Sequence, residues 1–189
     1  MKIKHTSVLF LTLLGATAGF PQVTLNPVPA RAIGQSILVP ESGNPNLVEG
    51  RELYSPQGIA VDNSVSPPIV YVADTGNNRV LAWKNAASFS NGAMADLVIG
   101  QPDRFSTVPY GPGTTFSTGL NTPAGLAVHG GDLYVVDSGN NRVLRYPNPF
   151  SATGQTPPNL YIGQLSLSSR VPNQPNGQEI GRASCRERV

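Results

Sequence analysis

The chain has 189 residues, and its 20 glycines and 18 prolines make up about one residue in five, against a usual one in eight or so. Both residues break helices and mark turns, so the composition favours a turn-rich β protein over a helical bundle. Charged residues make up only 13% of the chain and the formal net charge is +2. No long run of one charge is present, which excludes a coiled coil and an acidic or basic interaction tail.

The N-terminus has the pattern of a secretory signal peptide. Lys2 and Lys4 precede an apolar run at 8–14, and Ala16-Thr17-Ala18 has the small-x-small form of a cleavage site. The apolar run is about half of the roughly 20 residues that a membrane-spanning helix needs. Residues 1–18 are therefore expected to be a signal peptide, with no membrane span after cleavage, and the protein is expected to be secreted or periplasmic. Cleavage after Ala32 is a second possibility.

The C-terminal residues 180–189 resemble one translated reading frame of a short-read sequencing adapter, so 179–189 is expected to be an artefactual tail. This tail contains the only cysteine of the chain. Residues 19–178 have eight Lys and Arg against nine Asp and Glu, a formal net charge of −1. So few scattered cations do not form the positive surface that nucleic-acid binding requires. The lack of cysteine in this span excludes disulfides, a thiolate nucleophile and a Cys-based zinc site.

The central part of the chain contains an internal repeat. Three segments of the first copy recur in the second copy. The two copies differ in length after the first of these segments, where residues 63–68 of the first copy are replaced by Gly130-Gly131 in the second. Such a difference falls where a hairpin loop can absorb it. The paired segments are 56–62 with 123–129, 70–81 with 133–144, and 97–101 with 160–164.

Each copy of the repeat predicts four short strands, because stretches of β-branched and aromatic residues are bounded by Gly, Pro, Asn or Asp. In the first copy the strands are expected at 58–61, 69–73, 79–83 and 97–99. The second of these is apolar at both odd and even positions, so both of its faces should be buried. The expected fold is all-β, a β-propeller of four-stranded antiparallel blades, present here as a partial propeller.

These residues resemble the NHL-repeat β-propeller family. The resemblance rests on Pro-x-Gly-Ile/Leu-Ala-Val, on the Tyr-Val-Ala/Val-Asp-Ser/Thr-Gly-Asn-Asn-Arg-Val hairpin and on the strand that follows. His129 departs from the family, which usually has Asp there. The expected organisation is a linker with the outer end of a preceding blade at 19–53, a blade at 54–101, a long linker at 102–122, a blade at 123–164 and the start of a further linker at 165–178.

The hairpin motif is expected to be structural. Asp74 and Asp137 can accept hydrogen bonds from amides two residues on, and Gly76 and Gly139 can supply positive φ. Such a carboxylate would contribute about 1 kcal/mol. A calcium loop is the alternative, although Asn85 replaces the bidentate glutamate that such a loop needs. The motif residues are Asp74, Gly76, Asn77, Asn78 and Arg79 in the first copy and Asp137, Gly139, Asn140, Asn141 and Arg142 in the second, the two arginines being expected to bridge hairpins or blades.

Enzyme signatures are scarce in this sequence. It has no Gly-x-Ser-x-Gly elbow, no phosphate-binding loop and no His-Glu-x-x-His motif. We therefore predict no catalytic residue, metal or cofactor. The alternative, implied by the resemblance, is a propeller lactonase or lyase with a divalent metal in the central tunnel. The innermost strands of the two copies offer only Asp62 and His129 as ionisable groups.

The long linker 102–122 offers the candidate binding residues. Loops of this length in a compact domain are usually binding segments or disordered. This one places Arg104, Phe105, Tyr110 and Phe116 among Gly, Ser, Thr and Pro. Aromatic and arginine side chains can anchor a partner, or they can shield the sides of the blades. The sequence thus predicts an exported, non-catalytic binding or scaffold module for a protein or carbohydrate partner.

Overall fold

The computed structural model describes residues 29, 31–35, 48–110, 118–151 and 157–172. The expected signal peptide, the tail 179–189 and Phe116 lie outside these ranges. The described part contains eight β-strands and three short 3₁₀ helices and no α-helix, which confirms the all-β prediction. Within these ranges no helix has the length and hydropathy needed to cross a membrane. The strands are β1 Gly58–Asp62, β2 Ile69–Asp74, β3 Arg79–Trp83, β4 Leu97–Ile99, β5 Pro123–His129, β6 Asp132–Asp137, β7 Arg142–Tyr146 and β8 Leu160–Ile162, and the 3₁₀ helices are η1 Thr75–Asn77, η2 Ser138–Asn140 and η3 Pro149–Ser151.

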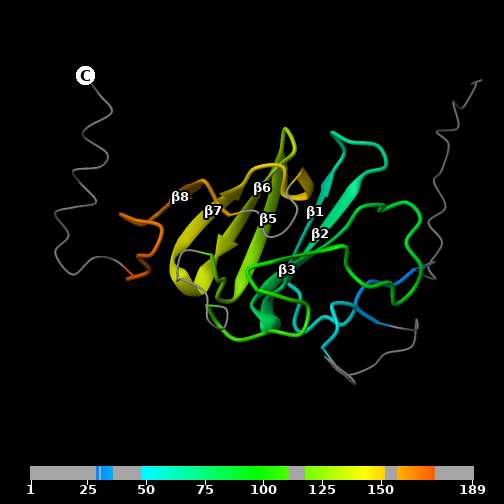
Figure 1. Ribbon diagram of the computed structural model, residues 1–189, viewed down its shortest axis with the longest axis horizontal. Helices are drawn as coiled ribbons and strands as arrows, with labels where there is room; N and C mark the ends of the chain where they lie inside the picture. The colour runs from blue at the N-terminus through cyan, green and yellow to red at the C-terminus, as the bar shows by residue number, and fades with distance from the viewer. Residues whose placement is uncertain (1–28, 30, 36–47, 111–117, 152–156, 173–189) are drawn as a thin grey trace, which may run out of the picture.

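The strands form two four-stranded sheets, one for each copy of the repeat (Figure 1). The orders are β1-β2-β3-β4 and β5-β6-β7-β8, and all neighbouring strands are antiparallel. The four strands expected in the first copy are present, two of them one residue longer than predicted. The repeats differ in length at the loop between the first two strands, as expected, and both Gly130 and Gly131 have positive φ in the shorter loop. The prediction of four-stranded antiparallel blades is confirmed.

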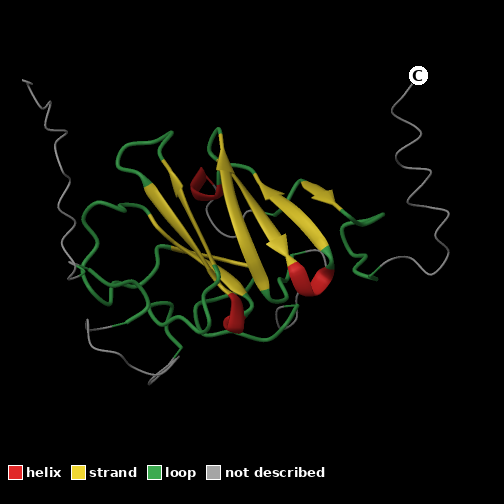
Figure 2. Ribbon diagram, turned by 180° about the vertical axis from the view of Figure 1, so that it is seen from behind, coloured by secondary structure: helices red, strands yellow, loops and turns green. Residues whose placement is uncertain are grey.

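The first strands of the two sheets, β1 and β5, lie close together (Figure 2). A Cβ atom on Gly58 would lie 2.2 Å from the carbonyl oxygen of Ala124, so only glycine permits this approach. The pairing of β5 with β6 shifts register between Pro123 and Leu126, which marks a bulge at the start of β5. The close approach of these strands brings the two sheets face to face as adjacent blades.

An apolar core fills the space between the sheets. Burial of these side chains is the main favourable contribution to holding one sheet against the other. The first sheet provides Tyr71, Val80, Ala82 and Ile99, the second provides Leu133, Val135, Leu144 and Tyr146, and Leu120 enters from the linker.

A second core covers the opposite face of the first sheet. Ile33 and Phe89 pack there against buried residues that include Val70, Val72 and Trp83. Both faces of β2 are therefore buried, as its apolar sequence predicts. The segment 33–35 repeats the Ile-Gly-Gln sequence that ends the first blade at 99–101, and its geometry repeats as well. Gly34 and Gly100 both have positive φ, and a Cβ on either would meet Leu53 or Leu120 respectively, at 2.5 Å.

The far face of the second sheet is not covered by described residues. Val136 is 41% exposed and Ile162 is 55% exposed, whereas the equivalent residues of the first sheet, Ala73 and Ile99, are 0% and 3% exposed. The described sheets therefore do not close into a ring, and they form a partial propeller with one open blade face.

Candidate functional site

The hairpin motif of each sheet contains a buried ion pair. In the first sheet Arg79 Nε lies 2.7 Å from Asp74 Oδ2, and both side chains are 0% exposed. In the second sheet Arg142 Nε lies 2.8 Å from Asp137 Oδ2, and the two side chains are 1% and 0% exposed. The register of the hairpin places each pair directly opposite one another where two strands meet, Asp74 opposite Arg79 and Asp137 opposite Arg142.

The carboxylates do not accept hydrogen bonds from amides two residues on, so that prediction is wrong. Asp74 Oδ1 accepts from the main-chain N–H of Tyr54 at 2.6 Å, and Asp137 Oδ1 accepts from that of Asn121 at 2.8 Å. Each donor lies in the segment that precedes the first strand of its sheet. This segment runs beside the hairpin, so its N–H group reaches the carboxylate. Each second carboxylate oxygen also accepts from the side chain of an asparagine three residues on, Asn77 or Asn140.

The expected positive φ at Gly76 and Gly139 is also wrong. The left-handed residues are Asn78, with φ 53°, and Asn141, with φ 54°. Gly76 is required for space, because a Cβ there would lie 2.4 Å from Tyr54 Cδ1, and its N–H donates to the carbonyl of Tyr54. Asparagine tolerates the left-handed region better than other residues with a side chain.

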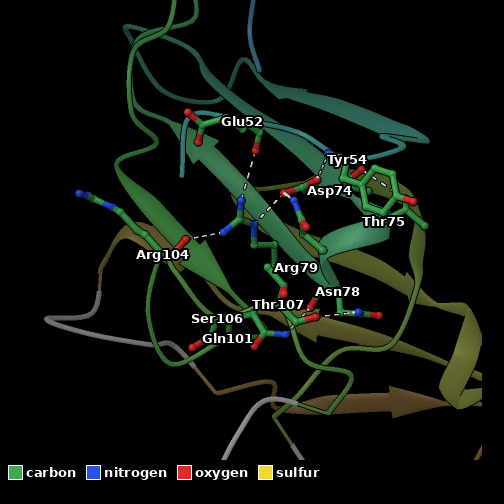
Figure 3. A network of polar contacts seen from close by, with 12 residues as sticks. Glu52, Tyr54, Asp74, Thr75, Asn78, Arg79, Gln101, Arg104, Ser106 and Thr107 are labelled. Atoms are coloured by element: carbon green, nitrogen blue, oxygen red, sulfur yellow. Dashed lines mark hydrogen bonds and ion pairs between the residues drawn. The ribbon is translucent and has the colours of Figure 1, made fainter. Parts of the chain in front are cut away.

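Arg79 ties together three segments of the chain (Figure 3). Besides Asp74, its guanidinium donates to the carbonyl of Glu52, before β1, and to the carbonyl of Arg104, after β4. Arg142 repeats this arrangement and donates to the carbonyls of Gly119 and Leu167. The arginine therefore fixes the segments that enter and leave its own blade.

A glutamine holds the segment after each blade, which sequence reasoning missed. Gln101 is fully buried, and its side-chain amide donates to the carbonyls of Asn78 and Val108, both at 2.9 Å. Gln164 donates in the same way to Asn141 and Val171. The signal for this was present in the sequence, because a Val-Pro pair follows both glutamines at the same spacing, at 108–109 and 171–172. The start of the long linker is thus part of the repeat.

Burial raises the pKa of both hairpin carboxyls above the ordinary value for aspartate. For Asp74 the charge of Arg79 opposes this effect, followed by the hydrogen bonds from Tyr54 and Asn77. For Asp137 the opposing contributions come from the hydrogen bonds of Asn121, Asn140 and Arg142. The described hydrogen bonds of these carboxylates all come from groups of the protein itself, an arrangement that supports folding.

The candidate binding residues contact different parts of the molecule. The stem of Arg104 packs against Gly50, and its guanidinium reaches the sulfur of Met94 at 3.9 Å. Phe105 projects outward and is 64% exposed. The ring of Tyr110 lies under the guanidinium of Arg170, 4.3 Å from its centroid, so this aromatic packs against the segment after the second blade. Phe116 falls outside the described residues.

We use the name linker surface for the exposed side chains of Met94, Phe105 and Val108 together with the half-buried Arg104, which contacts Met94. Val108 is 55% exposed and Met94 is 39% exposed. Asp103 accepts hydrogen bonds from the N–H groups of Phe105 and Ser106 at 2.9 and 2.8 Å, which fixes the turn that presents the phenyl ring. The hydroxyl of Ser106, followed by these two N–H groups, lowers the pKa of the exposed Asp103 carboxyl.

Asp62 and His129 occupy equivalent ends of β1 and β5 and differ in environment. Asp62 is buried, and its Oδ1 accepts from the N–H and hydroxyl of Ser64 at 2.9 and 2.6 Å. His129 is exposed and lies opposite Asp132 in the hairpin register. In the described part of the chain, no group of three or more His, Cys, Asp or Glu side chains is placed to hold a metal ion.

Comparison with protein families identifies one part of the chain. Residues 120–146 match the model of the NHL repeat. This span covers β5, β6 and β7, and it includes the hairpin with the buried Asp137–Arg142 ion pair. The expected resemblance to NHL-repeat proteins is confirmed for this span. A comparison with curated proteins found no match.

Proposed function

We propose that this chain is part of an exported, non-catalytic NHL-repeat propeller that binds a protein partner through the linker surface. The observation that supports this most directly is the exposed Phe105, which projects from a fixed turn beside Arg104. Aromatic, methionine and arginine side chains are enriched in protein interfaces, and the linker surface combines all three.

The backbone on either side of Phe105 is held in place by side chains of the first blade. Arg79 binds the carbonyl of Arg104, and Gln101 binds the carbonyl of Val108, so hydrogen bonds flank the exposed ring on both sides. A binding segment that is ordered before it meets its partner loses less conformational entropy on association. The buried motif therefore supports binding indirectly, by positioning the segment that leaves the blade.

Export is the second part of the proposal, and it rests on the N-terminal sequence. The basic residues, short apolar run and small-x-small site within 1–18 have the order of a signal peptide. Expression with and without residues 1–18, followed by fractionation, tests this. We expect the intact precursor to give a shortened product outside the cytoplasm, and the deletion to retain the protein inside.

The binding proposal is tested with a matched pair of variants. Phe105 and Ile59 are 64% and 65% exposed, so Phe105→Ala and Ile59→Ala remove similar exposed apolar groups from different surfaces. Proteins captured from the envelope and medium of the source organism are identified, and the purified binary complex is titrated. Phe105→Ala should weaken its Kd by about tenfold or more, as at an interface anchor. Ile59→Ala should leave the Kd unchanged.

Three results would contradict this proposal. Equal affinity of the two variants for every captured protein would remove the role of the linker surface. Binding of glycans at the linker surface in place of a protein would assign it to a carbohydrate partner. Hydrolysis of a lactone that stops on addition of a chelator would show a metal-dependent enzyme.

A further inference from the structure

Residues 31–35, which we call the N-terminal strap, lie against the first blade although they come well before it in the sequence. Figure 1 shows the strap in blue beside this blade. The side chain of Ile33 packs on the second core, and Gly34 forms an isolated parallel bridge with Glu52, just before β1. The strap is therefore part of the folded protein.

The first two residues of the strap contact the loop between β3 and β4. The main-chain N–H of Ala32 donates to Asn91 Oδ1 at 3.1 Å. The guanidinium of Arg31 donates to the carbonyl of Ala87 and lies 5.9 Å from the centroid of the Phe89 ring. Two hydrogen bonds and a cation–π contact thus hold the beginning of the strap to this loop.

The loop that receives the strap is itself held to the blade. The indole N–H of the buried Trp83 donates to the carbonyl of Ala93 at 3.0 Å. The N–H of Ala93 donates to the carbonyl of Ser90 at 3.0 Å, which closes a turn that contains Asn91. The acceptor for the Ala32 N–H therefore belongs to an ordered part of the first blade.

These contacts bear on the two cleavage sites that the sequence leaves open, after Ala18 and after Ala32. Ala18 closely follows the apolar run at 8–14, as in a signal peptide, whereas Ala32 is far from that run. Cleavage after Ala32 would remove both hydrogen bonds to the loop. It would also place a charged amino group on Ile33, whose side chain packs on an apolar core, and such a charge is costly to bury.

We propose that export cleavage occurs after Ala18, and that the mature protein keeps the N-terminal strap as a clamp on the loop between β3 and β4. This inference rests on the proposed export, and it names the bond that the signal peptidase hydrolyses. The position of Ala18 next to the apolar run supports the choice of site. The contacts of Arg31 and Ala32 give these residues a structural role that cleavage after Ala32 would abolish.

The cleavage site is tested by expressing the full chain in a host that exports it and determining the intact mass and N-terminal sequence of the exported product. We expect a product that begins at Gly19. A product that begins at Ile33 would overturn this inference and leave the export proposal intact. A chain that keeps residues 1–18 and stays inside the cell would overturn export, and the cleavage site with it.

The role of the strap is tested by a double-mutant cycle on purified chains that begin at Gly19 or at Ile33. Asn91→Ala should lower the folding equilibrium constant of the Gly19 chain by about twofold to tenfold more than that of the Ile33 chain, which lacks the Ala32 N–H. Urea unfolding followed by the fluorescence of Trp83 measures both losses. The difference between the chains cancels any effect of the substitution on the turn itself.

Asn159→Ala is the matched control. Asn159 lies in the corresponding loop of the second blade, where its Oδ1 accepts from Arg145 Nε at 3.0 Å. Its substitution should cost the same in both chains. Equal losses for Asn91→Ala in the two chains would show that the strap does not clamp the loop and would overturn the inference.

Discussion

Substitution of Asp74 by asparagine should destabilise the chain severely. The variant keeps the side-chain shape but removes the charge that faces Arg79, and both residues are fully buried. It also places an amide N–H₂ where the carboxylate now accepts from Tyr54, Asn77 and Arg79, so at least one donor loses its acceptor. Breaking a buried ion pair by removing one partner costs about 3–5 kcal/mol. That is a large part of a typical domain stability of about 5–15 kcal/mol.

The magnitude can be measured by urea unfolding at neutral pH. Trp83 is the only tryptophan, is 2% exposed and lies in the first sheet, so its fluorescence reports on the blade that contains Asp74. Asp132→Asn is the control. Asp132 lies 3.8 Å from Arg145 with both side chains partly exposed, and such pairs contribute about 1 kcal/mol or less. The reasoning is refuted if Asp74→Asn loses no more free energy of unfolding than Asp132→Asn.

A double mutant tests whether the loss arises from the pair itself. Arg79→Met removes the buried charge, so the Asp74→Asn, Arg79→Met chain should be less destabilised than the sum of the single variants. Strict additivity would show that Asp74 and Arg79 act independently, contrary to their distance of 2.7 Å.

Three further predictions concern other parts of the molecule. The open face of the second sheet should cause self-association, which Ile162→Lys should reduce in sedimentation velocity; a compact wild-type monomer at high concentration would contradict this. Gly76→Ala should cost about 1–3 kcal/mol in urea unfolding through overlap with Tyr54, and an unchanged stability would show that the two segments separate easily. The pKa of Asp103, measured by NMR, should lie below the ordinary value because of the hydroxyl of Ser106 and two N–H groups. The Asp103 carboxylate then contributes to stability above its unfolded-state pKa, and this contribution is lost as the pH falls through the lower folded-state pKa. A folded-state pKa equal to the ordinary value for aspartate would contradict the hydrogen-bonded turn.

The strands of this protein could be predicted from the sequence because they depend on local pattern. Apolar residues at successive positions of 69–73 predicted a strand buried on both faces, and Val70 and Tyr71 are 3% and 1% exposed. The shorter loop of the second copy could be placed because two adjacent glycines can adopt the positive φ that such a turn requires.

The hydrogen-bond partners of the motif could not be predicted, because they come from distant parts of the chain. The sequence shows that Asp74 has an amide two residues on, but not that the N–H of Tyr54, twenty residues earlier, approaches its carboxylate. The same holds for Gly76, whose role depends on the nearby Tyr54 and not on its own φ. Exposure of Phe105 and internal packing of Tyr110 likewise depend on tertiary contacts, so the sequence left both interpretations open for these two aromatics.

The two ends of the sheets carry different features of the molecule. At one end, Arg79 holds the segment that carries Phe105, so loss of Asp74 should disturb the linker surface as well as the fold. At the other end, a cavity of about 290 Å³ is lined by Asp62, Ile69 and Tyr71 of the first sheet and by Gly131 and residues 148–151 from loops of the second blade, so it depends on how the blades pack. β2 joins the two ends through six residues, about 20 Å of extended chain. Changes at Phe105 should therefore leave the cavity unaltered, whereas changes in the core between the sheets should alter the cavity first.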